Sequence, residues 1–292
     1  MSATENGDLE LVTAADLALE RFEAALDTYR QALEKAPAEA LGQRRPGEEY
    51  TLAGLAYHVN AVLDHIRATA RAMLDAGLRE TSAPDSSNLF EVANAKAGAT
   101  PTEPERDAAL AETVELHTAI RGLLTGVGPT DWGRTVPVRF GPGDPHPTRL
   151  LDVLGWLTDH YAEHTAQVTS LLADWRTLAV HEEIDRALAA RDVDAFLACM
   201  SEDSVFENTT PAPDGERLVG LPAVGAFFKQ FFVSTPSARF TTEEAFAAGD
   251  RAVVRWRFDW DEGPDNRGHV RGVDILRVTN GRVAEMRSYV KG

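Results

Sequence analysis

The sequence predicts two domains: an all-α four-helix bundle, followed by an α+β cone in which covering helices pack on a curved antiparallel sheet. The length of 292 residues exceeds the roughly 100–200 residues of a typical single domain. Apolar residues recur with a period near 3.6 in the first half of the chain and alternate with a period of 2 toward its end. Because the period changes near residue 180, we predict a bundle over residues 1–178 and a cone over residues 179–292.

Four helices account for the first half of the chain. The segments between them contain Pro, Gly, Ser and Asn, which favour turns and loops. The segment FGPGDPHP, residues 140–147, is expected to be a loop because its prolines lack amide donors and fix φ. The helices are predicted at residues 14–36, 51–76, 103–124 and 148–176. This is the content of a four-helix bundle.

The second half combines helices with a run of strands. A helix over 181–200, a short strand at 204–208 and a second helix at 221–232 come first. Four longer strands follow, separated by turn signals such as Glu-Gly-Pro-Asp and Thr-Asn-Gly. They are predicted at residues 238–248, 250–260, 267–279 and 282–290. Helices followed by an antiparallel meander form an α+β domain.

The chain is strongly acidic and contains a single cysteine. Lysine and arginine number 29 against 46 for aspartate and glutamate, which gives a formal net charge of −17. A surface this acidic repels phosphate groups, so we expect neither nucleic acid nor a membrane surface as a partner. Cys199 has no second cysteine to pair with. The N-terminus lacks the features of a signal peptide, and no run of about 18 apolar residues occurs, so we expect a cytoplasmic protein.

Three histidines are predicted to face the interior of the bundle. His160 and His164 are four residues apart in the last helix, so both imidazoles share its apolar face. His58 lies within the apolar stripe of the second helix. Three neutral imidazoles around a divalent cation leave positions open for water or substrate, as in catalytic metal sites. The alternative is a set of hydrogen-bonded core histidines, because the HxxxH spacing also occurs by chance.

The segments TLAGLAYHVNAVLDHI and LLDVLGWLTDHYAEHTAQV, which contain these histidines, resemble the DinB-like bundle superfamily. Its members include mycothiol-dependent maleylpyruvate isomerases and other bacterial thiol S-transferases. The resemblance covers about residues 10–176 and implies that His58, His160 and His164 bind a divalent metal ion. Zinc, nickel and iron all suit three imidazole ligands. The resemblance further implies a low-molecular-weight thiol, such as mycothiol, as a cosubstrate.

One acidic residue lies on an apolar face of the predicted sheet. Asp274 is the only charged residue among the alternate positions of strand 267–279 that share its face. The same face of the neighbouring strand carries Trp256 and Phe258, which form an aromatic wall. Burial there is expected to raise the pKa of Asp274, so that it can serve as a general acid or base. The alternative is that Asp274 pairs with an arginine or a backbone amide and only orders the sheet.

The segments RDVDAFLACMSEDSVFENTTP and GVDILRVTNGRVAEMRSYVKG resemble the SnoaL-like branch of the nuclear transport factor 2-like fold, over about residues 180–291. The resemblance implies a sheet curled around a deep cone, and it places Asp274 at the position of a pocket acid. Polyketide cyclases, ketosteroid isomerases and epoxide hydrolases share this fold. In the ketosteroid isomerase pattern, Asn208 stands where the general base would be, and Ile184 stands near the oxyanion-hole tyrosine. An amide takes up no proton at neutral pH, so cyclase-like or binding roles are expected instead.

These predictions combine into a metal-dependent enzyme of thiol-transferase, isomerase or hydrolase type that acts on a small organic molecule. The three histidines hold the metal, and Asp274 is the catalytic residue of a second, hydrophobic pocket. Ligand contacts there are predicted for Asn208, Trp256, Phe258 and Met286. The alternative is a non-catalytic protein that binds or sequesters an apolar molecule, with the bundle as a structural or dimerising platform. A homodimer is expected under either hypothesis.

Overall fold

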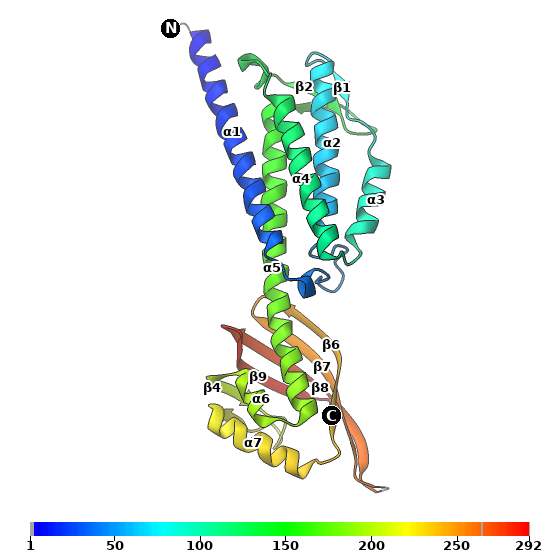
Figure 1. Ribbon diagram of the computed structural model, residues 1–292, viewed down its shortest axis with the longest axis vertical. Coiled ribbons are helices and arrows are strands. Elements are labelled where there is room, and N and C mark those ends of the chain that lie inside the picture. The colour runs from blue at the N-terminus through cyan, green and yellow to red at the C-terminus, as the bar shows by residue number, and fades with distance from the viewer. Residues whose placement is uncertain (1–2, 264, 292) are drawn as a thin grey trace. The chain divides into compact units, whose positions relative to one another are not determined.

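The computed structural model describes residues 3–263 and 265–291. Two compact units divide the chain, Met1–Thr169 and Ser170–Gly292. The first unit is helical, and the second is a curved sheet with helices, so the predicted fold class is confirmed (Figure 1). No helix within the described residues has both the length and the apolar character needed to cross a membrane.

Four helices form the bundle of the first unit, and they lie side by side in Figure 1. They are α1 (Ala3–Glu34), α2 (Leu55–Asp75), α4 (Glu103–Leu124) and the first part of α5 (Leu150–Ala190). Large side chains fill the space between them, with Phe22, Tyr29 and Tyr161 fully buried. The start of α4 is fixed by Glu105, whose carboxylate accepts a hydrogen bond from the Thr102 amide at 2.8 Å. The bundle therefore combines an apolar interior with a defined helix start.

The connections in the first unit contain more structure than the sequence predicts. The additional elements are α3 (Ser87–Ala97), the 3₁₀ helices η1 (Ala38–Ala40) and η2 (Pro129–Asp131), and the strands β1 (Thr81–Ser82), β2 (Val136–Arg139) and β3 (His146–Thr148). The loop predicted over 140–147 is partly wrong, because His146 and Pro147 belong to β3. This strand pairs only with β2, at the edge of the three-stranded sheet. A proline is tolerated there because an edge strand leaves amide positions unpaired.

Helix α5 corrects a second prediction. The sequence analysis ends one helix at Arg176 and begins another at His181, whereas α5 continues without interruption from Leu150 to Ala190. Neither proline nor glycine occurs between residues 156 and 190, so nothing in the backbone stops the helix. The predicted domain boundary at residue 178 therefore falls inside α5, as does the division between the compact units after Thr169.

The second unit contains a six-stranded sheet with the order β5-β4-β9-β8-β7-β6. Its strands are β4 (Met200–Glu207), β5 (Arg217–Val219), β6 (Arg239–Ala248), β7 (Arg251–Asp261), β8 (Arg267–Thr279) and β9 (Arg282–Val290). The sheet is mixed rather than purely antiparallel, because β4 runs parallel to β9. A parallel pair needs a long connection, and most of the unit lies between these two strands. The predicted Asn-Gly turn joins β8 to β9, with positive φ at Asn280 and Gly281.

The core of the second unit lies between the inner face of the sheet and three helices. These are the second part of α5, α6 (Val193–Ala198) and α7 (Leu221–Ser234). The carboxylate of Asp192 begins α6 by accepting a hydrogen bond from the Ala195 amide at 2.9 Å. Helix α5 is tied to the β6–β7 turn, since Asp174 accepts a hydrogen bond from the Gly249 amide at 2.6 Å. This contact fixes α5 along the open side of the sheet.

A β-bulge in β6 decides which of its residues face inward. Thr242 pairs with Trp256, but Glu244 pairs with Arg255, so Glu243 is an extra residue. Before the bulge the even-numbered Phe240 and Thr242 point to the inside of the cone. After it the odd-numbered Ala245 and Ala247 pack against the core. Because of the bulge, even-numbered residues of β6 face the cavity before Glu243, and odd-numbered residues face the core after it.

Candidate functional site

The structure brings together the three histidines that the sequence predicts as metal ligands. His58 comes from the first turn of α2, and His160 and His164 come from successive turns of α5. One ring nitrogen of each lies within 4.8 Å of the others. The ring centroids are 5.3 Å apart for His58 and His160, 5.0 Å for His58 and His164, and 4.4 Å for His160 and His164. The i, i+4 spacing on one helix and a single ring from its neighbour are sufficient to build this cluster.

The hydrogen bonds of these rings leave ligand atoms free. His58 Nδ1 and His160 Nε2 are buried and have no hydrogen-bond partner among the described residues. Nδ1 of His164 lies 2.9 Å from Oε1 of Gln167. Because a carbonyl oxygen only accepts, this contact assigns the proton of His164 to Nδ1 and keeps the Nε2 lone pair available. Buried nitrogens without partners are costly, so this donor set fits a divalent cation such as zinc, nickel or iron.

The protonation state of the cluster also suits a metal. Burial, with the neighbouring His164 and His58, lowers the pKa of His160 to about 3. Burial lowers the pKa of His58 as well, against the opposing effects of a hydrogen bond with Asn94 and the charge of Glu163. The pKa of His164 is lowered by burial too. The rings are therefore neutral at pH 7, which is the form that binds metal ions.

Aromatic and amide side chains hold His58 from outside the cluster. The Tyr50 ring stacks on the His58 imidazole with centroids 4.9 Å apart. The Tyr50 hydroxyl donates a hydrogen bond to Oδ1 of Asn94 at 2.9 Å. His58 and His160 are half-buried, whereas His164 is buried. The cluster is thus supported by neighbours, and two of its three residues keep some exposure to solvent.

Replacing Gln167 by alanine is expected to weaken metal binding about tenfold, because loss of an outer hydrogen bond to a ligand histidine frees its ring and its tautomer. Isothermal titration of metal-free protein with zinc measures the effect. Gln31→Ala, at an exposed position of α1, is the matched control. Equal affinities for the two variants would show that Gln167 does not orient His164.

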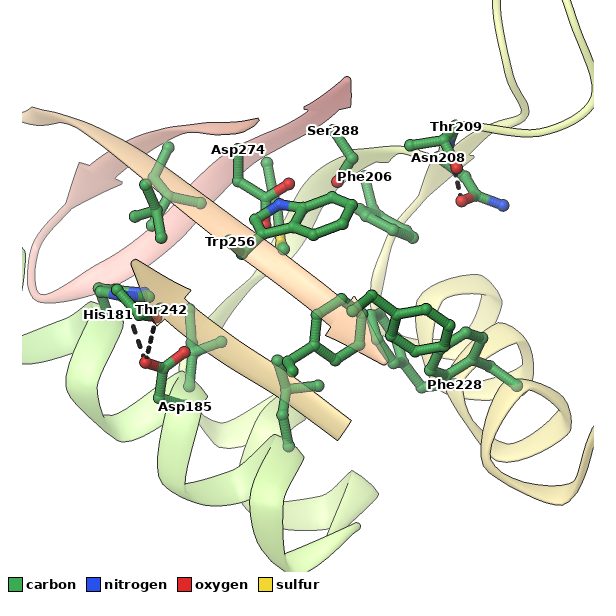
Figure 2. A pocket seen from close by; sticks show the side chains of 18 of the residues that line it. His181, Asp185, Phe206, Asn208, Thr209, Phe228, Thr242, Trp256, Asp274 and Ser288 are labelled. Atoms are coloured by element: carbon green, nitrogen blue, oxygen red, sulfur yellow. Dashed lines mark hydrogen bonds and ion pairs between the residues drawn. The ribbon is translucent and has the colours of Figure 1, made fainter. Parts of the chain in front are cut away.

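The second unit contains a cavity of about 180 Å³ between α5, α7 and the inner face of the sheet (Figure 2). The residues predicted to contact a ligand, Asn208, Trp256, Phe258, Met286 and the acid Asp274, all line it. Most of the remaining lining is phenylalanine and aliphatic side chains. The titratable groups in this lining are Asp274, His181 and Asp185. The cavity is therefore suited to an apolar molecule that meets a few polar groups.

Asp274 lies on the sheet wall of the cavity, and its surroundings change its acidity. Burial raises its pKa to about 6, hydrogen bonding from Ser288 and Trp256 opposes the shift, and the charge of Asp185 adds to it. In Figure 2 the indole nitrogen of Trp256 is turned toward the Asp274 carboxyl. Neither that nitrogen nor Oδ1 of Asp274 has a partner with full hydrogen-bond geometry among the described residues. The carboxyl is therefore available to a ligand.

Gly272 explains how Trp256 reaches this position. The two residues pair across β7 and β8, and a Cβ on Gly272 would collide with the Trp256 ring. Only glycine lets the indole lie across the strand at this point.

The sequence analysis did not identify several polar residues of the cavity, among them His181 and Asp185 of α5 and Thr242 of β6. Thr242 Oγ1 donates a hydrogen bond to Asp185 Oδ2 at 2.6 Å. His181 Nε2 lies 3.4 Å from the same carboxylate oxygen and 3.3 Å from Thr242 Oγ1. A usable signal existed, because His181 and Asp185 alternate with Ile184 and Leu188 on one helix face. This is the same pattern that identifies His160 and His164.

Comparison with known proteins agrees with both units. A family model described as the DinB superfamily matches residues 21–168, which is half of the chain. The chain belongs to the DinB superfamily. A second family model, described as a SnoaL-like domain, matches residues 180–286. This DinB-superfamily protein therefore carries a SnoaL-like domain after its bundle, as the sequence motifs predict.

Solved structures similar to this DinB-superfamily protein include an NTF2-like protein of unknown function from Mesorhizobium loti. It is 36% identical, with 41% of this chain and 93% of that chain covered and a TM-score of 0.36. RV0760c from Mycobacterium tuberculosis is 30% identical, with 39% and 90% covered and a TM-score of 0.35. That protein has also been solved in complex with estradiol-17β-hemisuccinate. No curated protein matches the chain.

Proposed function

We propose that this DinB-superfamily protein is a metal-dependent enzyme of thiol-transferase, isomerase or hydrolase type that acts on a small organic molecule. The convergence of His58, His160 and His164 within 4.8 Å, with two buried nitrogens lacking partners, supports the proposal. These residues would hold a divalent ion, zinc, nickel or iron. A bound ion of this kind supplies Lewis acidity, which lowers the pKa of a water or of a thiol such as mycothiol.

The protein contributes the support of this site. Gln167 fixes the tautomer of His164 by accepting the hydrogen bond from its Nδ1. Tyr50 stacks on His58 and limits the rotation of that ring. We infer that a substrate would approach from the side of His58 and His160, because these two residues are only half-buried. Rigid support of this kind holds ligands in a single arrangement, as a catalytic site needs.

The proposed activity is tested by following the disappearance of a small electrophilic acid such as maleylpyruvate in the presence of mycothiol. We expect dialysis against a chelator to abolish turnover and one equivalent of zinc, nickel or iron to restore it. Turnover that survives complete removal of metal would contradict the proposal. The absence of turnover with any acceptor, in protein that retains its metal, would favour the non-catalytic alternative.

For the SnoaL-like domain, we propose that the cavity binds an uncharged apolar molecule and that Asp274 is its acid. Phe258 and Trp256 supply the aromatic surface, and Met286 adds an apolar wall. Asn208 lies at the end of β4, where its Oδ1 accepts a hydrogen bond from the Thr209 amide at 2.7 Å. Its Nδ2 donates to the Thr210 hydroxyl at 3.3 Å, so local contacts hold the amide, and Asn208 would shape the ligand site. The predicted homodimer and cytoplasmic location stay predictions.

The neutral fluorescent probe N-phenyl-1-naphthylamine is expected to bind this cavity, and Phe258→Ala should weaken binding about tenfold, since an aromatic contact contributes roughly 0.5–1.5 kcal/mol beyond its area. The enhancement of probe fluorescence measures the affinity. Phe246→Ala is the matched control, because Phe246 is in the same sheet but 38% exposed. If Phe246→Ala and Phe258→Ala weaken binding equally, the probe binds elsewhere.

A further inference from the structure

We propose that the cavity of the SnoaL-like domain is a proton-transfer site in which the Asp185 carboxylate is the general base and the Asp274 carboxyl is the hydrogen-bond donor to an oxygen that gains charge. The inference rests on the acid role proposed for Asp274 and adds the base that the sequence did not reveal. It uses residues of the second unit alone. A failure of the metal-dependent function proposed for the bundle would therefore not affect this inference, and the reverse also holds.

Asp185 is held in position through one carboxylate oxygen, and its side chain is partly exposed. Thr242 donates to Oδ2 at 2.6 Å, and His181 Nε2 lies 3.4 Å from the same atom. The other oxygen, Oδ1, accepts no hydrogen bond from the described residues, and the side chain is 38% exposed. In Figure 2 the carboxylate projects from α5 into the cavity. One oxygen thus anchors the group while the other is free to accept a proton.

His181 and Thr242 act as positioning residues. Burial lowers the pKa of His181 against the opposing charge of Asp185, so the imidazole is largely neutral at pH 7. Because Thr242 gives its only proton to Asp185, its oxygen accepts from His181 Nε2, 3.3 Å away. The chain of contacts therefore runs from imidazole to hydroxyl to carboxylate, with both donors directed toward Oδ2 of Asp185.

Asp274 completes the pair from the opposite wall, in strand β8. Its Oδ1 has no partner among the described residues, and burial raises its pKa to about 6, so the carboxyl is protonated and able to donate below about pH 6. Asp185 lines the same cavity from α5, with Oδ2 held by Thr242 and the side chain 38% exposed. The partly exposed, anchored carboxyl of Asp185 is thus placed to take a proton, and the buried carboxyl of Asp274 is placed to donate a hydrogen bond.

The lining of the cavity indicates the class of substrate. It contains no lysine or arginine among the described residues, and its carboxylate would repel an anion. The substrate is therefore an uncharged apolar molecule with a carbon-bound proton close to an oxygen that can accept charge. Asp185 Oδ1 takes this proton, the C–H electron pair forms a new π bond, and the displaced pair moves onto the oxygen that Asp274 stabilises. No oxidant, reductant or metal is required.

The probe reaction is the elimination of 5-nitrobenzisoxazole, a small neutral bicycle. The base removes the proton on carbon, the electron pair forms a nitrile, and the N–O bond breaks to give a coloured phenolate. The proton on Asp185 then returns to water, so one molecule of probe gives one of product. Because the reaction needs a base and an oxygen-stabilising donor, it reports on both carboxyl groups.

We expect the full-length protein to accelerate this elimination, and Asp185→Asn to lower kcat/KM about 100-fold. Asp274→Leu should lower it by a similar factor, because it removes the donor to the oxygen. Asp203→Asn, at an exposed position of β4, is the matched control and should leave the rate unchanged. The rate should also survive chelation and the double substitution of His160 and His164 by alanine.

Thr242 gives a second test that does not depend on how well Asp185→Asn folds. Thr242→Val removes a hydrogen bond to the carboxylate, so the acid limb of the pH–rate profile should move to higher pH. Thr242→Ser should restore it. A rate no greater than that of acetate buffer at equal concentration would overturn the inference. A rate that depends on Asp274 but not on Asp185 would also overturn it, while leaving the role proposed for Asp274 intact.

Discussion

Protein in which His160 and His164 are both replaced by alanine is expected to lose its bound metal. The wild-type protein should carry close to one divalent ion per chain after purification, and the double variant less than a tenth of that. The reason is that a single imidazole, His58, does not retain an ion against the competing buffer. Elemental analysis by mass spectrometry measures the metal directly.

His65→Ala supplies the matched control. His65 is also on α2, but its Nδ1 lies 2.8 Å from the Ser86 hydroxyl, and it is not part of the three-histidine cluster. Metal content should not change in this variant. Bound metal should also stabilise the folded wild-type chain, by about 4 kcal/mol at a free concentration 1,000 times Kd. Equal metal content in the double variant and the wild type would contradict the site.

The second large effect concerns Asp274 and pH. Its pKa in the folded protein is about 6, against an ordinary value of 3.8, so the folded state binds the proton more tightly than the unfolded state. This contribution to stability is fully present below about pH 4 and is lost as the pH rises through 6. We therefore expect Asp274→Asn, which cannot ionise, to gain about 2 kcal/mol relative to wild type between pH 4 and pH 7.5.

Urea unfolding of the full-length chain, followed by tryptophan fluorescence at several pH values, measures this difference. His181 and Asp185 are the other titratable groups that line the cavity, and both are present in wild type and variant alike. Asp203→Asn, on the exposed side of β4, controls for the loss of one carboxylate. A difference between Asp274→Asn and wild type that does not vary with pH would refute the raised pKa.

The parts of the candidate sites that the sequence predicts are those set by a regular period. His160 and His164 share a helix face because they are four residues apart, and Asp274 shares a strand face with its apolar neighbours because the period of a strand is two. Such patterns need no knowledge of tertiary structure. The bundle, the four long strands of the second unit and the Asn280–Gly281 turn follow from the same local rules.

What the sequence does not predict depends on contacts between distant segments. β4 pairs in parallel with β9, and the sequence of neither strand alone indicates which strand it will pair with. Helix α5 continues past Arg176 because a change in hydrophobic pattern alters which face is buried without stopping a helix. Asp185 could have been found from its helix face, but its contact with Thr242 could not, since the bulge at Glu243 carries no local signature.

That bulge has a consequence for how related sequences can diverge. On the two sides of Glu243, β6 follows opposite alternation, so the gain or loss of a single codon there would invert one half of the strand relative to the other. With the later half fixed by Ala245 and Ala247 in the core, a deletion would turn Phe240 and Thr242 outward. Such a deletion would remove the Thr242 hydroxyl from the cavity wall and leave the core contacts of Ala245 and Ala247 unchanged. Related sequences could therefore gain or lose the polar wall of this cavity through one insertion or deletion, without a series of substitutions.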